Sequence, residues 1–136
     1  MIGYVTVGTN DKERALKFYD EIFKIIGIGR LWETDQFTSY GAGLTEPQLS
    51  VTIPYDKKPA TVGNGNMVAI FVDSTEKVDA MYKKAIELGA QDEGPAGARG
   101  EGGFYAGYFR DMDGNKLNVF TITKDMSEFV DESTKE

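Results

Sequence analysis

The side chains available for acid–base chemistry are carboxylates, Lys116 and tyrosines, because the 136 residues include no histidine and no cysteine. Histidine is the commonest general base at neutral pH and the commonest metal ligand, and a thiolate nucleophile requires cysteine. No Ser/His or Cys/His catalytic set can therefore form. No carboxylate, lysine or tyrosine stands in a spacing that indicates a tuned pKa. The pattern does not exclude an enzyme, but it predicts no particular catalytic residue.

The composition also limits the partners that we expect. The net charge is −7, and no basic patch with interleaved aromatic residues occurs, so nucleic acid is not an expected partner. No apolar run approaches the roughly 18–20 residues of a membrane span, and no secretory signal precedes the first strand-like segment. A cytoplasmic protein without disulfides or a membrane anchor is expected. The acidic surface serves solubility, or attracts cationic ligands.

The order of predicted elements occurs twice along the chain. Strand-like residues over 2–8 precede Thr9-Asn10-Asp11, which can cap a helix that ends before Gly27, and strands follow near 30–34, 37–42 and 48–54. The second half repeats this order, with a strand over 66–72, a helix after Asp73, a short strand near 90–93, and strands over 104–110 and 115–122. Residues 94–103 between them are so rich in glycine that we expect no regular structure there.

This repeat predicts an α+β fold of two βαβββ modules that form a mixed, curved sheet around a cleft, with the helices on the outside. We expect one domain over residues 1–123. Module one covers about residues 1–56, a linker covers 57–65, and module two covers about 66–123. Residues 124–136 are predicted to be a polar C-terminal tail.

Several segments of this repeat resemble the vicinal oxygen chelate superfamily, which includes glyoxalases, bleomycin-resistance proteins and extradiol dioxygenases. The resemblance rests on residues 3–7, on Arg14-Ala15-Leu16-Lys17-Phe18-Tyr19, on residues 78–82 and above all on residues 107–118, which end in Asp111-Met112-Asp113-Gly114-Asn115-Lys116-Leu117-Asn118. The last segment is similar to the closing hairpin of the family. The resemblance covers nearly the whole chain to about residue 123.

The resemblance also identifies four positions that hold metal ligands in metal-using members. Here these positions hold Tyr4, Ser50, Met67 and Asn118. A neutral tyrosine, a hydroxyl, a thioether and an amide are poor ligands for a divalent metal. We therefore predict no metal site and no cofactor, and glyoxalase-type isomerase chemistry through a metal is not expected.

Strand alternation predicts which side chains line the cleft. The parity of Asn118 selects Lys116 and Phe120 on the same strand, and pairing across a hairpin at Asp113-Gly114 adds residues of the preceding strand. The candidate ligand-binding residues are Tyr4, Thr6, Ser50, Thr52, Met67, Phe71, Tyr105, Phe109, Asn118 and Phe120, together with Arg99 from the glycine-rich loop, which could pair with an anion. Alternatively, these side chains fill the cleft as a second core and Arg99 is an exposed loop residue. Trp32 and Tyr40 are predicted at the cleft edge, in the core or at a dimer contact.

Three functions fit this pattern. The first is a glyoxalase-like protein that binds a small organic molecule in the cleft without a catalytic metal, with Tyr4, Tyr105 or Asn118 as hydrogen-bonding groups. The second is a drug-sequestering protein of the bleomycin-resistance type, because an acidic chain suits a cationic drug. The third is a lactoylglutathione-lyase-like enzyme with atypical ligands. Because members of the superfamily often pair modules across subunits, the resemblance also implies a homodimer.

Overall fold

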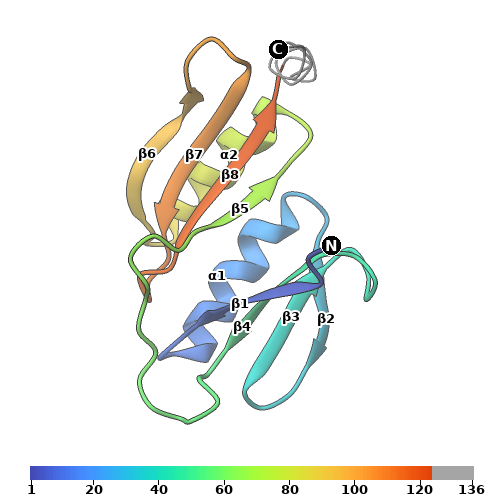
Figure 1. The fold of residues 1–136 in the computed structure, drawn as a ribbon, viewed down its shortest axis with the longest axis vertical. Helices are drawn as coiled ribbons and strands as arrows, with labels where there is room; N and C mark the ends of the chain where they lie inside the picture. Colours follow the sequence, from blue (N-terminus) through green and yellow to red (C-terminus); the bar gives the residue numbers. More distant parts are fainter. Residues whose placement is uncertain (124–136) are drawn as a thin grey trace, which may run out of the picture.

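Two four-stranded mixed sheets, each with one helix, make up the computed structural model, which describes residues 1–123 (Figure 1). Module one consists of β1 (Tyr4–Gly8), α1 (Lys12–Lys24), β2 (Gly29–Glu33), β3 (Phe37–Gly41) and β4 (Gln48–Thr52). Module two consists of β5 (Val68–Phe71), α2 (Thr75–Glu87), β6 (Gln91–Ala98), β7 (Phe104–Arg110) and β8 (Lys116–Ile122). The strand orders, β1-β4-β3-β2 and β5-β8-β7-β6, are equivalent, so the α+β class and the two βαβββ modules are confirmed. The predicted tail lies outside the described residues.

Both helices begin where the sequence offers a capping side chain. Asp11 accepts a hydrogen bond from the Arg14 backbone N–H at the start of α1, and Ser74 accepts one from the Lys77 backbone N–H at the start of α2. Gly27 and Gly89 follow the helices with positive φ values of 70° and 107°, a conformation that glycine adopts without strain. Neither helix is long and apolar enough to span a bilayer.

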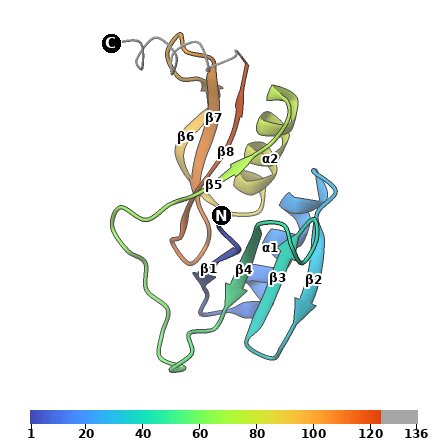
Figure 2. The ribbon, with the colours of Figure 1, turned by 45° about the vertical axis from the view of Figure 1, so that its right-hand side comes forward.

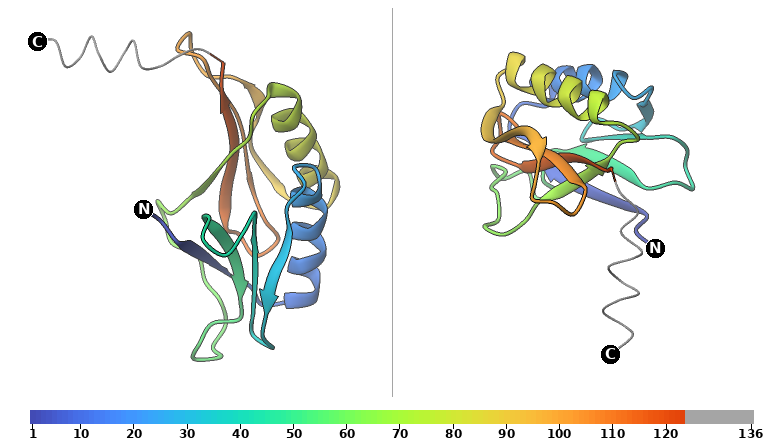
Figure 3. Two further views of the ribbon diagram at one scale, coloured as in Figure 1. Left: turned by 90° about the vertical axis from the view of Figure 1, so that its right-hand side faces the viewer. Right: turned by 90° about the horizontal axis from the view of Figure 1, so that it is seen from above.

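The helices cover one side of the two sheets and leave the other side uncovered (Figure 3). We call the uncovered side of each sheet its open face; the open faces of both modules point toward the viewer in Figure 1. Between the helices and the sheets lies the core, which includes Phe18, Ile22, Val78, Met81 and Phe109. The connection between β4 and β5 runs as a long loop along one side of the molecule (Figure 2).

The turn between β7 and β8 joins module two to module one. The buried Tyr19 hydroxyl of α1 donates to Asp111 at 2.6 Å, and the Thr9 hydroxyl donates to Asp113 at 2.6 Å. The side-chain amide of Asn115 donates to the Gly8 carbonyl at 2.8 Å. Burial and the Asp111 charge raise the pKa of Tyr19 well above its ordinary value. The hairpin motif that carried the family resemblance is thus the polar contact that orients the two modules.

The predicted facing of β7 is wrong by one residue. A two-residue turn at Asp113-Gly114 would place Phe109 opposite Asn118, but the structure pairs Tyr108 with Asn118 and Arg110 with Lys116. The turn therefore contains the five residues 111–115, since Asp111 accepts hydrogen bonds from the backbone N–H groups of residues 113 and 115. A shift of one residue moves every side chain of a strand to the other face.

The glycine-rich segment also differs from the prediction. Strand β6 continues to Ala98, well beyond the short strand expected near 90–93. It stays paired with β7 through two register shifts, one between Asp92 and Gly94 and one between Gly94 and Gly97. Glycine allows such bulges, and Gly94 has a φ of 148°. Only residues 99–103 form a loop between β6 and β7.

Candidate functional site

The open face of module one carries a row of aromatic rings. Tyr4 of β1 and Trp32 of β2 both contact Phe37 of β3, with ring centroids 6.1 Å and 4.7 Å apart. Tyr4 is 61% exposed. Ser50 of β4 lies on the same face, because it is in register with Thr6 of β1. This face therefore presents large apolar rings above small hydroxyl groups.

The open face of module two carries a second row of rings. Phe120 of β8 lies between Phe71 of β5 and Phe104 of β7, with centroid distances of 5.7 Å and 5.3 Å. Phe71 is 59% exposed. Asn118 lies two residues before Phe120 on this face and is in register with Tyr108. The two modules thus repeat one arrangement of aromatic rings beside a polar residue.

Ser50 and Asn118 occupy equivalent places in the two modules. Each directly follows a leucine in the fourth strand of its module, Leu49 in β4 and Leu117 in β8. Both leucines face the helices. Both Ser50 Oγ and Asn118 Oδ1 are buried and have no hydrogen-bond partner among residues 1–123. Because an unpaired buried polar atom is costly, these two atoms indicate where a ligand group would be accepted.

A hollow of about 460 Å³ lies where the modules meet. It is lined by the end of β1, by residues 61–63, 65 and 66 of the connection between β4 and β5, by the start of β5 and by the start of β8. Of the predicted cleft residues, Thr6 and Met67 line this hollow, and Lys116 joins them. Ser50, Thr52, Phe71, Asn118 and Phe120 lie on the open faces outside it.

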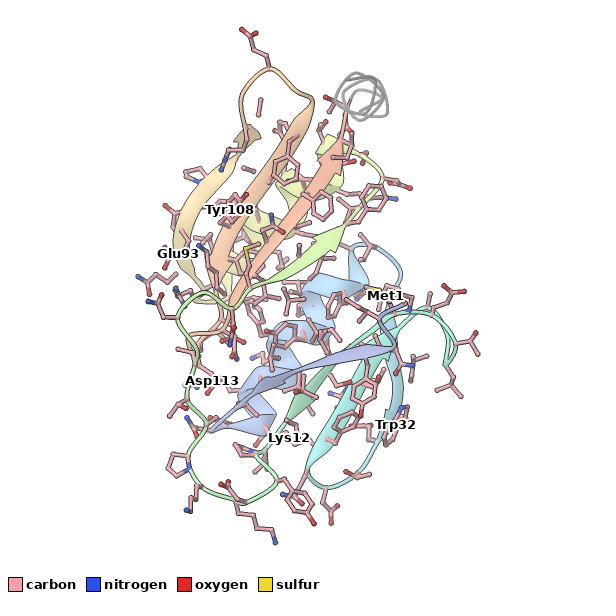
Figure 4. All side chains as sticks on the ribbon, in the orientation of Figure 1. Met1, Lys12, Trp32, Glu93, Tyr108 and Asp113 are labelled. Atoms are coloured by element: carbon pink, nitrogen blue, oxygen red, sulfur yellow. The ribbon has the colours of Figure 1, made fainter. Side chains whose placement is uncertain are left out.

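Tyr105 and Phe109, predicted on the open face, lie on the helix side of β7. Phe109 is fully buried in the core, and the Tyr105 hydroxyl donates to Asp79 of α2 at 2.6 Å. That hydrogen bond to a carboxylate raises the pKa of Tyr105. Tyr108, predicted under the helix, faces outward instead (Figure 4). The sequence signal that could have identified Tyr108 is Asp111, whose carboxylate accepts hydrogen bonds from the backbone N–H groups of residues 113 and 115 and so extends the turn to residues 111–115.

The two aromatic residues with several predicted places lie in different parts of module one. Trp32 is on the open face, half-exposed (Figure 4). Tyr40 is in the core, where its hydroxyl donates to Asp20 of α1 at 2.8 Å. Burial and the Asp20 carboxylate raise the pKa of Tyr40. A strong pair with Arg30 lowers the pKa of Asp20. This cluster is structural, since it ties α1 to β2 and β3.

Arg99 follows the last residue of β6, and its side chain turns back over that strand. The guanidinium donates to the carbonyls of Gly97 and Pro95, at 2.9 Å and 2.5 Å, and lies 5.5 Å from the centre of the Tyr108 ring. Lys116 Nζ lies 5.7 Å from the centre of the same ring. The structure therefore brings two cations to the open face of module two.

The donor set at the four family ligand positions does not fit a divalent metal. Tyr4 and Met67 are largely exposed, whereas Ser50 and Asn118 are buried and neutral. Among residues 1–123, no three histidine, cysteine or carboxylate side chains gather into a potential metal site. Zinc, nickel and manganese require imidazole, carboxylate or thiolate ligands, so the side chains at these four positions do not support chemistry through such a metal.

Comparisons with known proteins agree with the geometry. Residues 1–119 match the family model described as glyoxalase/bleomycin resistance protein/dioxygenase superfamily. A glyoxalase/bleomycin resistance protein from Albidiferax ferrireducens T118 is 34% identical, covers 89% of this chain and 98% of its own, and superposes with a TM-score of 0.81. A comparison with curated proteins returned no match.

Two more distant structures show the fold alone. One is a glyoxalase/bleomycin resistance protein/dioxygenase family enzyme from Burkholderia phytofirmans PsJN, with 19% identity, coverage of 88% and 97%, and a TM-score of 0.70. The other is a lactoylglutathione lyase from Agrobacterium tumefaciens, with 19% identity, coverage of 89% and 92%, and a TM-score of 0.64. The equivalent modules and the extended family match lead to one conclusion: the chain belongs to the glyoxalase/bleomycin resistance protein/dioxygenase superfamily.

Proposed function

We propose that this protein binds a small organic molecule against its open faces and does so without a divalent metal. The observation that carries the proposal is the pair of buried, unpartnered atoms Ser50 Oγ and Asn118 Oδ1 within residues 1–123. They lie at the family's ligand positions, beside rings that offer apolar contact. Apolar walls with a few hydrogen-bonding groups are typical of small-molecule pockets.

We further propose that a second copy of the chain completes the pocket. Large apolar side chains are exposed on both open faces, including Tyr4, Trp32, Met67 and Phe71. Exposed apolar patches of this kind mark interaction surfaces. Because the two modules present similar rows of rings, the open face of one module in one copy suits the other module in its partner. A homodimer is therefore the proposed assembly, with the ligand between the copies.

The positive charges on the open face of module two disfavour the second candidate function, which is sequestration of a cationic drug. The protein is acidic overall, but Arg99 and Lys116 place positive charge on the open face of module two. A cationic ligand would be repelled there. The cytoplasmic location expected from the sequence stays a prediction.

A screen of small organic molecules by thermal shift, followed by calorimetry on the hits, tests the proposal. We expect at least one hit whose affinity falls in both Ser50→Ala and Asn118→Ser, and is unchanged in Tyr55→Ala, a change at an exposed residue of the connection between β4 and β5. If every hit bound Ser50→Ala and Asn118→Ser with unchanged affinity, the proposal would be overturned.

Metal loading tests the second half of the proposal. Dialysis against zinc, nickel and manganese, followed by elemental analysis, should leave far less than one metal ion per chain. One ion per chain, lost in the Asn118→Ser variant, would contradict metal-free binding. Sedimentation analysis should show a dimer that Phe71→Glu dissociates, and a monomer at all concentrations would contradict the proposed assembly.

A further inference from the structure

Among residues 1–123, Arg99 differs from the other arginines of this protein in having no carboxylate partner. Arg14, Arg30 and Arg110 each form an ion pair with an aspartate or glutamate. In the same part of the chain, neither Arg99 nor Lys116 lies within ion-pair distance of a carboxylate. Other lysines of this part of the chain also lack an ion pair, but Arg99 and Lys116 lie beside the same ring, that of Tyr108, in a chain whose net charge is −7.

The backbone of β6 holds the Arg99 guanidinium in place. Gly94 leaves room for it, since a Cβ at this position would come within 3.3 Å of Nη2. The carbonyls of Pro95 and Gly97 accept hydrogen bonds from two of its five N–H groups, and the guanidinium carbon lies 5.5 Å from the centre of the Tyr108 ring. A guanidinium oriented in this way keeps donors for a further acceptor and loses little entropy when it binds.

Lys116 completes a cationic pair around Tyr108. Its Nζ lies near the same ring, and its residue is the first of β8 and lines the hollow at the module junction. Arg110, the third cation of this face, is neutralised by Glu93 at 2.7 Å and also donates to the Gly114 carbonyl. The positive charge of the face that has no carboxylate partner within residues 1–123 is therefore carried by Arg99 and Lys116, and both would attract an anion bound beside Tyr108.

The open face of β8 changes from charged to apolar along its length. Lys116, Asn118 and Phe120 follow one another on this face, and Phe120 contacts Phe71 and Phe104. At about 3.4 Å per residue, the strand covers about 14 Å from Lys116 to Phe120. A molecule with a carboxylate at one end and an aromatic or alkyl body at the other fits this order of groups.

We propose that Arg99, Tyr108 and Lys116 form a carboxylate subsite, so that the ligand is a small organic acid with an apolar body directed toward Phe120. The inference rests on the proposed small-molecule function and adds the ligand class and its orientation. Arg99 and Lys116 provide charge-assisted hydrogen bonds to the carboxylate. Asn118 Oδ1, in the middle of the row, accepts a hydrogen bond from a hydroxyl or amino group on the body of the ligand.

Calorimetric or NMR titration of the full chain with three matched probes tests the subsite. The probes are 3-phenylpropanoate, its neutral amide and the cationic 3-phenylpropylamine. We expect the acid to bind about tenfold more tightly than the amide, with the amine weakest, and we expect the preference to shrink as salt is added. The side-chain Nε–H signal of Arg99 should shift with the acid alone.

Two charge-removing variants and one matched control locate the preference. Arg99→Gln and Lys116→Gln should each lower the affinity for the acid by about tenfold and change the affinity for the amide by no more than about twofold. Arg110→Gln, which removes the paired cation of the same face, should change neither by more than about twofold. Circular dichroism and the melting temperature confirm that each variant is folded.

Three outcomes would overturn the subsite: equal binding of acid and amide, an acid affinity unchanged in both variants, or no binding of the acid. Inorganic phosphate serves as a fourth probe. If it competes with the acid at equal concentration, the site binds any anion and the assignment to organic acids is wrong. Binding of the neutral amide that depends on Asn118 would retain the proposed function while removing the subsite, so the two failures are distinguishable.

Discussion

The open faces of the two modules have the same construction but different charge. Module one places its aromatic row around Ser50 and Ser39, and Ser39 donates a hydrogen bond to the Gln48 side chain. Module two places its row beside Asn118 and adds Arg99 and Lys116 around Tyr108. Since the strand order of the two modules is equivalent, the difference lies in a few side chains and in the longer, bulged strand β6 that places Arg99.

The comparison shows that the two modules share the apolar residues of the core and differ in the residues of their open faces. Residues that face the helices are apolar in both modules, for example Leu49 and Val51 in β4, and Leu117 and Val119 in β8. Residues on the open faces are free to differ because no helix packs on them. One face can therefore supply apolar contact while the other supplies charge, without any change in the core.

The largest effect that we predict separates the two faces of β7. Phe109→Ala removes a fully buried ring that contacts Phe18 of α1, at a centroid distance of 6.2 Å. Truncation of a buried phenylalanine costs about 3–5 kcal/mol of unfolding free energy. Phe104→Ala, on the open face of the same strand, should cost about 1–2 kcal/mol because the ring is only partly buried.

Urea unfolding monitored by circular dichroism measures both costs. If the Phe109 and Phe104 variants lost the same free energy, the assignment of Phe109 to the helix side and Phe104 to the open face would be contradicted.

A smaller effect is expected at the polar contact between the modules. Tyr19→Phe removes the buried hydrogen bond to Asp111 and leaves that carboxylate with one donor fewer. Loss of a hydrogen bond to a charged group costs about 1.5–3 kcal/mol. Tyr55→Phe, at a tyrosine that is 98% exposed, is the matched control and should change stability by less than about 0.5 kcal/mol. Equal unfolding midpoints for the two variants would mean that the contact does not stabilise the arrangement of the modules.

The same tyrosine predicts how stability depends on pH. Its pKa is raised in the folded state, so the folded protein holds this proton more tightly than the unfolded chain does. The stabilisation is complete below about pH 10, the ordinary tyrosine pKa, and is lost as the pH rises above it. Tyr19 contributes at most about 1.4 kcal/mol per pH unit to this loss.

Urea midpoints between pH 8 and pH 11.5 test this sign. Tyr19→Phe should make the urea midpoint fall less steeply as the pH rises. Part of the fall should remain in this variant, since the pKa of Tyr40 is also raised. A decline of the same slope in Tyr19→Phe and in the unmodified chain would show that other groups cause it.

The sequence predicted the modules well because each signal is local and occurs twice. Helix caps such as Asp11 and Ser74, and the glycines that end the helices, act within one turn of the chain. The facing of β7 depends instead on whether a turn contains an even or odd number of residues, and Asp111 decides that number through its hydrogen bonds. An Asp-Gly pair does not carry this information.

The candidate site shows the same limit. Ser50 and Asn118 were identifiable from the family positions, because the strands that hold them occupy equivalent places. Strand β4 pairs in parallel with β1, and β8 pairs in parallel with β5. The place of Arg99 depends on two bulges of β6, which arise from pairing with β7 across a glycine-rich segment. Such tertiary pairing outweighs the weak strand preference of glycine, so composition indicated a loop where the structure has a strand.

The smallest effect that we predict concerns the two serines of module one. Ser50 Oγ has no hydrogen-bond partner within residues 1–123, whereas Ser39 Oγ donates to Gln48. Removal of an unpaired buried hydroxyl relieves its desolvation cost, so Ser50→Ala should be neutral or stabilising by up to about 1 kcal/mol. Ser39→Ala should cost about 0.5–1.5 kcal/mol because it breaks a hydrogen bond. If urea unfolding shows that Ser50→Ala destabilises the protein as much as Ser39→Ala, Ser50 Oγ is satisfied in solution and the open face of module one offers a ligand only apolar contact.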